Sequence, residues 1–355
     1  RPTLIVLRTV IADPAPTKRD TPGAHGAPLG AEEIRKTKAI LGWPDEPFFV
    51  PEAARADLGA VSARGADAEA SWQRGRAAYA KAHPAEAERF RLWISGDLPE
   101  GWDAGLPTFG IDAKAVETRK ASAAALKALA ASLPNLVGGS ADLAGSTGTA
   151  HGLGGDFGPG VAGQTVHWGI REHAMAACMN GMAAHGGVRP FGSTFLVFSD
   201  YMKPSIRLAA LMGLPVVYLG THDSIGVGED GPTHQPVEHL AMLRAIPNVV
   251  VLRPGDANET VEAWRAAVER RDGPTVLALT RQKLPVLDRA ALGPAAGVRR
   301  GGYVLYDPPG GAQAVLMATG SELSVALDAA ARLGQDGIRA RVVSLPSWEL
   351  FAAQP

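Results

Sequence analysis

The sequence predicts an α/β protein built on parallel, doubly wound sheets, with a partial second α/β domain at its C-terminal end. From about residue 112 to residue 280, short apolar segments rich in β-branched residues alternate with longer helical patterns. A similar alternation begins again at Tyr303, after a charged linker that contains proline. Strands this apolar are typical of a parallel sheet that helices cover on both faces.

The composition excludes several classes of protein. The chain has 355 residues, 46% hydrophobic and 20% charged, which is enough for two or three domains with a sizeable core. Its 35 basic and 36 acidic residues leave a net charge of -1, so we expect no nucleic-acid partner and no binding to a membrane. No apolar run approaches the ~18 residues that span a bilayer. A single cysteine, Cys178, fits a reducing compartment, and we expect a cytoplasmic protein.

The N-terminal region predicts a strand at Thr3–Ile11, a polar loop, and a helix that begins near Ala31. A stretch rich in alanine and charge follows over residues 51–110. It predicts amphipathic helices at Asp67–Lys81 and Pro84–Trp93, and we interpret it as a connector. Because the chain starts without methionine and stops shortly after a strand, we expect it to be part of a longer protein.

The remaining elements follow one another in a regular order, interrupted by a glycine-rich loop at residues 138–163. The predicted helices are Thr118–Ser132, Arg171–His185, Ser199–Met212, Pro236–Ala245, Glu259–Arg270 and Glu322–Leu333. The predicted strands are Leu136–Val137, Thr165–Trp168, Val188–Phe191, Val216–Leu219, Val249–Leu252, Thr275–Leu279, Ala314–Met317 and Ala340–Ser344.

Polar residues gather where the predicted strands end. Ligands of open parallel sheets bind outside the carboxyl ends of the strands. Five strand ends carry charged or small polar residues, which predicts a ligand site unless they only form solvated loops. The richest of these loops is Thr221–Gln235, with three glycines, two histidines and three carboxylates. We interpret this loop as a rigid polar rim that holds imidazole and carboxylate groups over a ligand.

Two further features of this edge suit a planar ring. Glu172 opens an apolar helix, and a carboxyl group buried there could hold or share a proton near neutral pH. The alternative is a first-turn glutamate that only balances the helix dipole. Phe195, Phe198 and Tyr201 are spaced three residues apart and would form an aromatic shelf on one helical face. Such spacing is also typical of a core.

Taken together, these segments resemble transketolase, the thiamine-diphosphate enzyme. The most specific match is Gly226–Glu238, which reads Gly-Val-Gly-Glu-Asp-Gly-Pro-Thr-His-Gln-Pro-Val-Glu. The matching stretches keep the family's order and cover nearly the whole chain. The others are Ala24–Gly30, Thr118–Ser122, Gly138–Leu143, His167–Glu172, Ser193–Leu196, Gly273–Gln282 and Ala318–Glu322.

The resemblance implies the thiamine-diphosphate-binding fold in three domains, and a homodimer with the coenzyme at the subunit interface. The tail of a diphosphate-binding domain would occupy residues 1–50 and a helical connector residues 51–110. A pyrimidine-binding domain would occupy residues 111–290, and a truncated C-terminal domain residues 298–355. The family's metal motif, Gly-Asp-Gly with a later Asn, is absent. We therefore assign no metal ligand, and expect the ligands of Mg2+ or Ca2+ in the missing N-terminal part.

The resemblance also implies roles for individual residues. Glu172 would hydrogen-bond N1′ of the aminopyrimidine and promote formation of the thiamine-diphosphate ylide. His25 and His234 would contact the cofactor or substrate hydroxyl groups and move protons. Phe198 and Tyr201 would stack on the pyrimidine, with Phe195 beside them and Asp142 near the cofactor. Asp230 would bind a donor hydroxyl group. A charge-assisted clamp of Arg119, Arg281 and His222, together with Ser146, would grip the substrate phosphate.

The implied reaction is the reversible transfer of a two-carbon glycolaldehyde unit from a ketose phosphate to an aldose phosphate. Such a reaction serves the pentose phosphate pathway or the Calvin cycle. One alternative is dihydroxyacetone (formaldehyde) synthase of the same family, although the phosphate-clamp residues favour a sugar phosphate. Another is a catalytically incompetent fragment that acts only as a binding or dimerising domain. A nicotinamide-dependent dehydrogenase is disfavoured because no Gly-x-Gly-x-x-Gly follows a strand with an acidic residue ~20 positions later.

Overall fold

The computed structural model describes residues 3–150, 154–228 and 230–355. The predicted glycine-rich loop and the Gly226–Glu238 block therefore each contain positions outside the described residues. The chain divides into two compact units, Arg1–Pro84 and Ala85–Pro355. The four segments expected from the sequence resemblance remain predictions.

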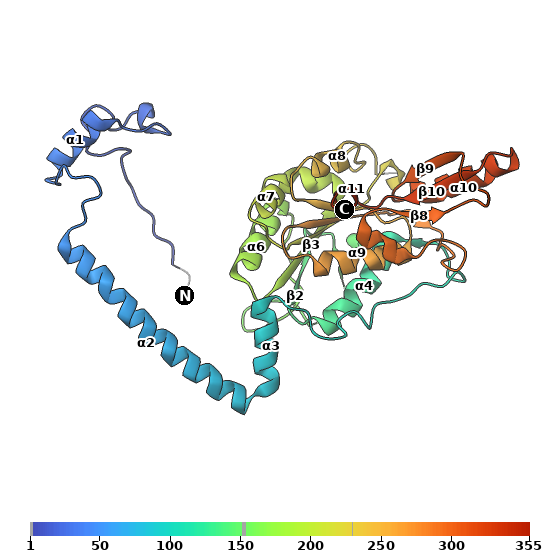
Figure 1. Cartoon of the computed structure of the whole chain (residues 1–355), viewed down its shortest axis with the longest axis horizontal. Helices are drawn as coiled ribbons and strands as arrows, with labels where there is room; N and C mark the ends of the chain where they lie inside the picture. The colour runs from blue at the N-terminus through green and yellow to red at the C-terminus, as the bar shows by residue number, and fades with distance from the viewer. Residues whose placement is uncertain (1–2, 151–153, 229) are drawn as a thin grey trace. The chain divides into compact units, whose positions relative to one another are not determined.

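The first unit consists of a loop region and helices (Figure 1). A short 3-10 helix, η1 (Pro22–Ala24), precedes α1 (Ala31–Ile40) and the long helix α2 (Glu52–Ala82). Glu33 fixes α1 to the preceding loop, because its carboxylate accepts hydrogen bonds from the backbone N–H groups of Thr17 and Lys18 at 2.6 and 3.1 Å. The helix expected at Asp67–Lys81 is the second half of α2.

The predicted strand at Thr3–Ile11 is wrong. This segment pairs with no strand among the described residues, and Leu4, Ile5, Val6 and Leu7 are all at least 74% exposed. An apolar, β-branched sequence favours a strand only when a neighbouring strand supplies the hydrogen bonds. The residues of this segment favour an extended backbone, but the described part of the chain provides no neighbouring strand to pair with it.

The second unit is built around a five-stranded parallel sheet with the order β2-β3-β4-β6-β5, which confirms the predicted fold class. The strand order means that β4 lies at the centre and β2 at one edge. Strands β2, β3 and β4 all end later in the chain than the sequence predicted. The strands are β2 (Leu136–Ser140), β3 (Arg189–Phe195), β4 (Val217–Thr221), β5 (Val250–Leu252) and β6 (Thr275–Leu279).

The strand predicted at Thr165–Trp168 is also wrong. Thr165 makes only isolated bridges, one of them to Gly138 of β2, and two backbone hydrogen bonds of 2.9 and 2.8 Å flank that contact. The segment lies so close to β2 that a Cβ atom on Gly139 would come within 2.1 Å of the Val166 oxygen. It therefore runs along the edge of the sheet without continuing as a strand.

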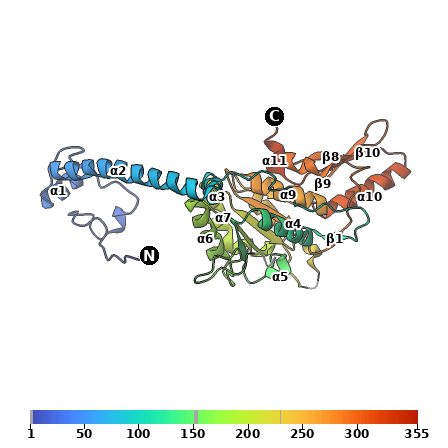
Figure 2. The same cartoon turned by 90° about the horizontal axis from the view of Figure 1, so that it is seen from below.

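Helices cover both faces of this sheet, as Figures 1 and 2 show. Successive residues of β4 point to opposite faces: Leu219 joins the cluster with Leu126 and Trp264, and Tyr218 joins the cluster with Met175 and Met179. This alternation is why each central strand is apolar throughout. The first face carries α4 (Thr118–Ser132) and α9 (Ala257–Glu269), and the second carries α6 (Glu172–His185), α7 (Ser199–Leu211) and α8 (His239–Arg244).

A three-stranded sheet follows in the order β8-β10-β9, and we call it the C-terminal sheet. Strand β10 runs parallel to β9 and antiparallel to β8, which confirms the second α/β alternation. A small antiparallel pair of β1 (Val116–Glu117) with β7 (Lys283–Leu284) was not predicted from the sequence. The C-terminal elements are β8 (Tyr303–Tyr306), β9 (Ala314–Ala318), α10 (Glu322–Gln335), β10 (Ala340–Ser344) and α11 (Trp348–Ala352).

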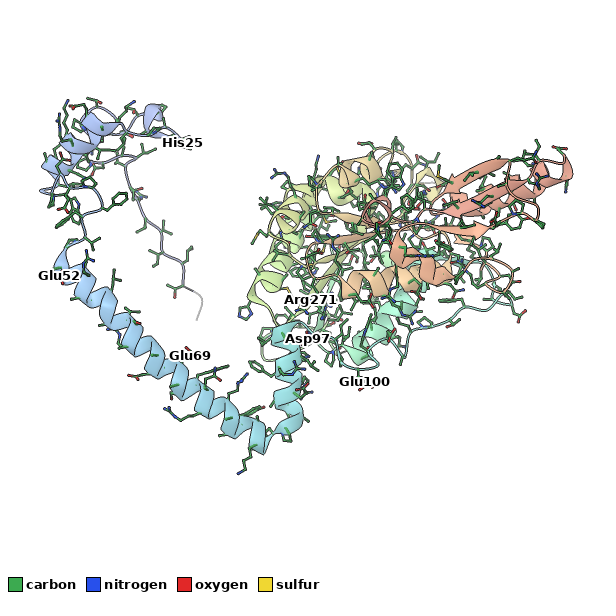
Figure 3. All side chains as sticks on the ribbon, viewed as in Figure 1. His25, Glu52, Glu69, Asp97, Glu100 and Arg271 are labelled. Carbon is green, nitrogen blue, oxygen red and sulfur yellow. The ribbon has the colours of Figure 1, made fainter. Side chains whose placement is uncertain are left out.

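Polar contacts fix the end of α3 (Pro84–Ser95) against the five-stranded sheet unit. Nη1 of Arg271 donates to Oδ1 of Asp97 at 3.1 Å, and the two side chains are labelled in Figure 3. The half-buried Arg189, at the start of β3, donates to the backbone oxygens of Gly96 and Val268. None of the described helices is both long and apolar enough to cross a membrane.

Candidate functional site

The carboxyl ends of β3 and β4 lie side by side and bring polar and aromatic residues together. Phe195, the last residue of β3, is in register with Thr221, the last residue of β4, which in turn pairs with Leu279 of β6. The residues that follow these positions in the chain carry most of the predicted site.

Glu172 is buried at this edge. Its residue is 8% exposed in the first turn of α6, and its Oε1 accepts a hydrogen bond of 3.3 Å from Oγ1 of Thr194, a fully buried residue of β3. Thr194 directly precedes Phe195, so the buried carboxyl group lies at the same end of β3 as the aromatic residues. The sequence analysis expected the burial of Glu172 but did not identify Thr194 as its partner.

The aromatic shelf is present, but its three residues do not share one helix. Phe195 ends β3, Phe198 lies in the 3-10 helix η2 (Leu196–Phe198), and Tyr201 lies in α7. The Phe195 and Phe198 rings stack with centroids 5.9 Å apart, and the Phe198 and Tyr201 rings are 6.0 Å apart. The rings come together because the chain turns at the end of β3, and not because they share one helical face. Tyr201 remains 64% exposed, so the shelf opens to solvent.

Two histidines from the Thr221–Gln235 loop lie against this shelf. The His222 ring centroid is 4.0 Å from that of Phe195, and the His234 centroid is 5.6 Å from Phe195 and 5.4 Å from Phe198. A neighbouring threonine contacts Nδ1 of each ring: Thr221 Oγ1 is 2.9 Å from His222 and Thr233 Oγ1 is 2.8 Å from His234. These contacts orient both imidazoles.

Electrostatic interactions link His222 to the other residues of the expected phosphate clamp. Burial, together with the positive charges of Arg119 and Arg281, lowers the pKa of His222 to about 4, while Asp230 acts in the opposite direction. His222 is therefore neutral at pH 7. The two arginines would then supply the positive charge of the expected clamp, and His222 an uncharged imidazole.

A pair of buried threonines positions the two arginines of the clamp, and the sequence analysis missed it. The backbone N–H of Thr118 donates to Oγ1 of Thr280 at 3.1 Å, and the backbone N–H of Thr280 donates to Oγ1 of Thr118 at 2.7 Å. Each threonine is fully buried and directly precedes one arginine, Arg119 or Arg281. The repeated Thr-Arg dipeptide is the sequence signal that could have indicated this pairing.

Arg119 also brings Ser146 to the clamp, because its Nη1 donates to the backbone oxygen of Ser146 at 2.5 Å. The buried Nε of Arg119 has no hydrogen-bond partner within the described part of the chain. Nη1 of Arg281 donates to the backbone oxygen of Val227 at 2.7 Å. The unused donor on Arg119 and the two neighbouring positive charges suit an oxyanion.

Asp142 lies in the second unit and His25 in the first. Asp142 follows the end of β2 at the same sheet edge, has a positive φ of 64° and is exposed. His25 ends η1 in the first unit, where its backbone N–H donates to the oxygen of Pro22 at 3.0 Å. Its side chain is exposed and is labelled in Figure 3.

The cluster fits one end of a ring-bearing coenzyme better than it fits a metal. A buried carboxyl group beside an open aromatic shelf can hydrogen-bond the edge of a heteroaromatic ring while the shelf covers its face. In residues 3–150, 154–228 and 230–355, no group of three or more His, Cys, Asp or Glu side chains could hold a metal ion.

Comparison with protein families gives three matches in chain order. The model described as "Transketolase, thiamine diphosphate binding domain" matches residues 1–99. The model described as "Transketolase, pyrimidine binding domain" matches residues 114–286, and the "Transketolase-like TK C-terminal domain" matches residues 301–355.

Individual relatives agree with these matches. A protein named transketolase from Geobacillus stearothermophilus is 52% identical over the whole chain, which covers 54% of that protein. A crystal structure of transketolase from Pichia stipitis in complex with sedoheptulose-7-phosphate has 41% identity and a TM-score of 0.90. The match covers 96% of this chain and 51% of the Pichia stipitis chain. The chain spans about half the length of the curated relatives it matches.

A third relative is matched over a larger share of its own length. The structure titled "Split gene transketolase, inactive beta4 tetramer" is 30% identical with a TM-score of 0.56. It aligns with 66% of this chain, and this chain covers 73% of it.

Proposed function

The chain belongs to the transketolase family, and on this premise we propose that it forms the pyrimidine-binding part of an enzyme that transfers two-carbon units between sugar phosphates. The donor would be a ketose phosphate and the acceptor an aldose phosphate. The observation that carries the proposal is the burial of Glu172 against Thr194, beside the shelf on which His222 and His234 lie.

The coenzyme in this proposal is thiamine diphosphate. When bound, it supplies a carbon nucleophile that adds to a carbonyl group and retains the two-carbon unit. Glu172 would hold a proton between its carboxyl group and N1′ of the aminopyrimidine, a role that suits a side chain excluded from water. Phe198 and Tyr201 would cover the ring face, with Phe195 behind them, and Asp142 would lie near the coenzyme.

The substrate would bind between the histidines and the phosphate clamp. His234 and His25 would hydrogen-bond substrate hydroxyl groups and transfer protons at those oxygens, while Asp230 would bind a donor hydroxyl. Arg119, Arg281, Ser146 and His222 would bind the phosphate. A neutral His222 is compatible with this role, because an uncharged imidazole still has one N–H that can donate a hydrogen bond to an oxyanion.

We expect Mg2+ or Ca2+ to accompany the diphosphate, with ligands from the part of the diphosphate-binding domain that this sequence does not include. The matched family model for that domain supports the expectation. Metabolism of sugar phosphates in the pentose phosphate pathway or the Calvin cycle would then take place in the cytoplasm.

We also propose a homodimer with the coenzyme at the subunit interface. The outer face of α6 carries small exposed residues, among them Ala174, Ala177 and Cys178. Leu211 of the adjacent helix α7 is 72% exposed, and Ile170 just before α6 is 79% exposed. An apolar face of this kind is typical of a surface that another protein covers, and a second copy would bring another Glu172 helix to the interface.

The test is an acceptor assay with xylulose 5-phosphate as donor. The chain is combined with a polypeptide that carries the diphosphate-binding domain of a relative, with thiamine diphosphate and Mg2+. Faster transfer to ribose 5-phosphate than to formaldehyde supports transketolase, whereas the reverse order supports dihydroxyacetone synthase. No transfer to either acceptor, although the coenzyme binds, supports a non-catalytic binding domain. The 355-residue chain alone should show no turnover.

A further inference from the structure

A series of charged groups ties the loop of His222 to residues 301–355, which we call the C-terminal unit. Arg253 follows the end of β5, and its Nε donates to Oδ2 of Asp223, the residue directly after His222, at 2.7 Å. Nη1 of the same guanidinium donates to Glu322, in the first turn of α10, and to the backbone oxygen of Thr319 at 3.1 Å. These contacts connect Asp223, the residue after His222, to the C-terminal unit through the Arg253 side chain.

The C-terminal unit holds Arg253 from several directions. The backbone N–H of Arg253 donates to the oxygen of Pro346 at 2.9 Å, and its backbone oxygen accepts from the N–H of Gly320 at 3.0 Å. Gly320 has a φ of +59°, and a Cβ atom there would lie only 2.6 Å from Nε of Arg253. The guanidinium thus packs directly on a turn that leaves no room for a side chain.

Asp223 is poorly explained by fold stability alone. Its side chain is completely buried, and its Oδ1 has no hydrogen-bond partner within the described residues. Replacing a buried ion pair with apolar side chains is often neutral or stabilising, so such a pair is weak evidence for a stabilising role. The backbone N–H of Asp223 donates to the oxygen of Leu279 at 3.2 Å, immediately before the Thr280–Arg281 side of the clamp. Asp223 therefore lies between two parts of the clamp.

His222 needs an external restraint because its backbone has a φ of 64°, a conformation that is uncommon for residues other than glycine. We propose that Asp223, Arg253 and Glu322 are positioning residues through which the C-terminal unit holds His222 against Phe195 for phosphate binding. The inference rests on the function proposed above for His222. It gives the C-terminal unit a part in substrate recognition, although none of its residues belongs to the aromatic and histidine cluster.

The test compares Arg253→Lys with a matched control, Arg341→Lys. Lysine keeps the charge but cannot bridge Asp223 and Glu322 at the same time. Arg341, also in the C-terminal unit, forms a bidentate pair with Asp307 at 3.0 and 2.9 Å, and neither residue contacts Asp223 or His222. In the 355-residue chain, Arg253→Lys should weaken ribose 5-phosphate binding about tenfold by calorimetry, and the control should not change it.

A second readout does not depend on substrate. The ring signals of His222 in NMR spectra, identified by their loss in His222→Gln, should stay those of a neutral imidazole down to about pH 4 in the wild-type chain. In Arg253→Lys, the ring should become protonated at a higher pH because it is no longer held in its buried position. If Arg253→Lys does not fold, Glu322→Ala replaces it, because the Glu322 side chain is 55% exposed.

The outcomes separate this inference from the proposed function. A folded Arg253→Lys or Glu322→Ala chain with wild-type ribose 5-phosphate affinity and wild-type His222 titration overturns the positioning role. If the wild-type chain does not bind ribose 5-phosphate but the His222 titration shifts in the variant, the positioning role stands and the proposed phosphate site fails.

Discussion

At the scale of single residues, the site depends on the burial of Glu172 and on one specific hydrogen-bond partner. Glu172 is excluded from water in the first turn of α6, and Thr194 donates to its carboxylate. The sequence could predict the first property, because a glutamate that opens an apolar helix is recognisable. It could not predict the second, since Thr194 is 22 residues away on a strand whose register only the folded sheet determines.

Substituting Glu172→Gln tests the proposed proton-holding role. Glutamine can still accept the hydrogen bond from Thr194, so we expect the thermal unfolding temperature to change little. The rate at which the bound coenzyme exchanges its thiazolium proton for deuterium should fall by several orders of magnitude, about 10²–10⁴-fold. The exchange is followed by quenched-flow NMR on the reconstituted enzyme. Wild-type exchange in a folded, coenzyme-loaded variant would remove Glu172 from the mechanism.

The lowered pKa of His222 predicts how stability depends on pH. Its folded value is about 4 and its ordinary value is 6.5, so between these values the unfolded chain binds more protons than the folded chain. His222 therefore makes the free energy of unfolding fall as the pH is lowered from about 6.5 to about 4. Urea unfolding at a series of pH values should show a smaller acid-induced loss for His222→Gln than for the wild-type chain. An equal loss in both chains would show that His222 is not held in a neutral state.

At the scale of elements, the clamp is built where α4 begins and where β6 ends. Thr118 and Thr280 exchange backbone-to-side-chain hydrogen bonds, and the arginines that follow them are placed as a pair. The two threonines are separated by 162 residues in the sequence. The hydrogen bonds therefore join the first helix of this sheet unit to its last parallel strand.

Thr280→Val should destabilise the chain and weaken phosphate binding together. The substitution removes the acceptor of the Thr118 N–H and leaves this buried donor unpaired, which costs about 1–3 kcal/mol in the free energy of unfolding. Thr275→Val, at the start of β6, is the matched control, because the buried Thr275 hydroxyl has no hydrogen-bond partner among the described residues. The control should be neutral or stabilising, as measured by urea unfolding and by calorimetry with ribose 5-phosphate. Similar losses in both variants would exclude a special role for the Thr118–Thr280 pair.

The helices and strands also show which sequence patterns were sufficient to predict an element. Helix α4 has the predicted bounds, because an alanine- and leucine-rich run with buried residues on one side is bounded by Glu117 and by Leu133 before a proline. The strand prediction at Thr3–Ile11 failed because no strand in the described part of the chain pairs with this segment. The helical reading of the aromatic shelf failed because the spacing of three residues continues through a strand end, a 3-10 turn and a helix. In both failures, tertiary context overrode a local pattern.

At the scale of the molecule, the five-stranded sheet brings to one edge residues that are far apart in sequence. The resemblance predicted most members of the site, and the structure brings the aromatic shelf, both loop histidines and the arginines together. The link from Asp223 through Arg253 to Glu322 was not predictable, because it joins three segments whose proximity depends on packing between two sheets.

The proposed dimer gives a prediction at the same scale. Ala177→Glu would place a charge on the exposed face of α6, and we expect the dimer to dissociate because an unpaired buried charge in an interface is costly. Ala124→Glu, on the exposed side of α4 on the opposite face of the sheet, is the control. Sedimentation equilibrium should give a monomer for the first variant and a dimer for the control. A wild-type chain that is monomeric at all concentrations would contradict the proposed interface.

The most direct measurement is a crystal structure of the chain, assembled with the diphosphate-binding domain of a relative and soaked with thiamine diphosphate and Mg2+. The account predicts a carboxylate oxygen of Glu172 about 2.6–3.2 Å from N1′ of the pyrimidine, which is hydrogen-bonding distance. It also predicts the ring of Phe198 against the pyrimidine face. A coenzyme bound elsewhere, with Glu172 still bonded only to Thr194, would contradict the account.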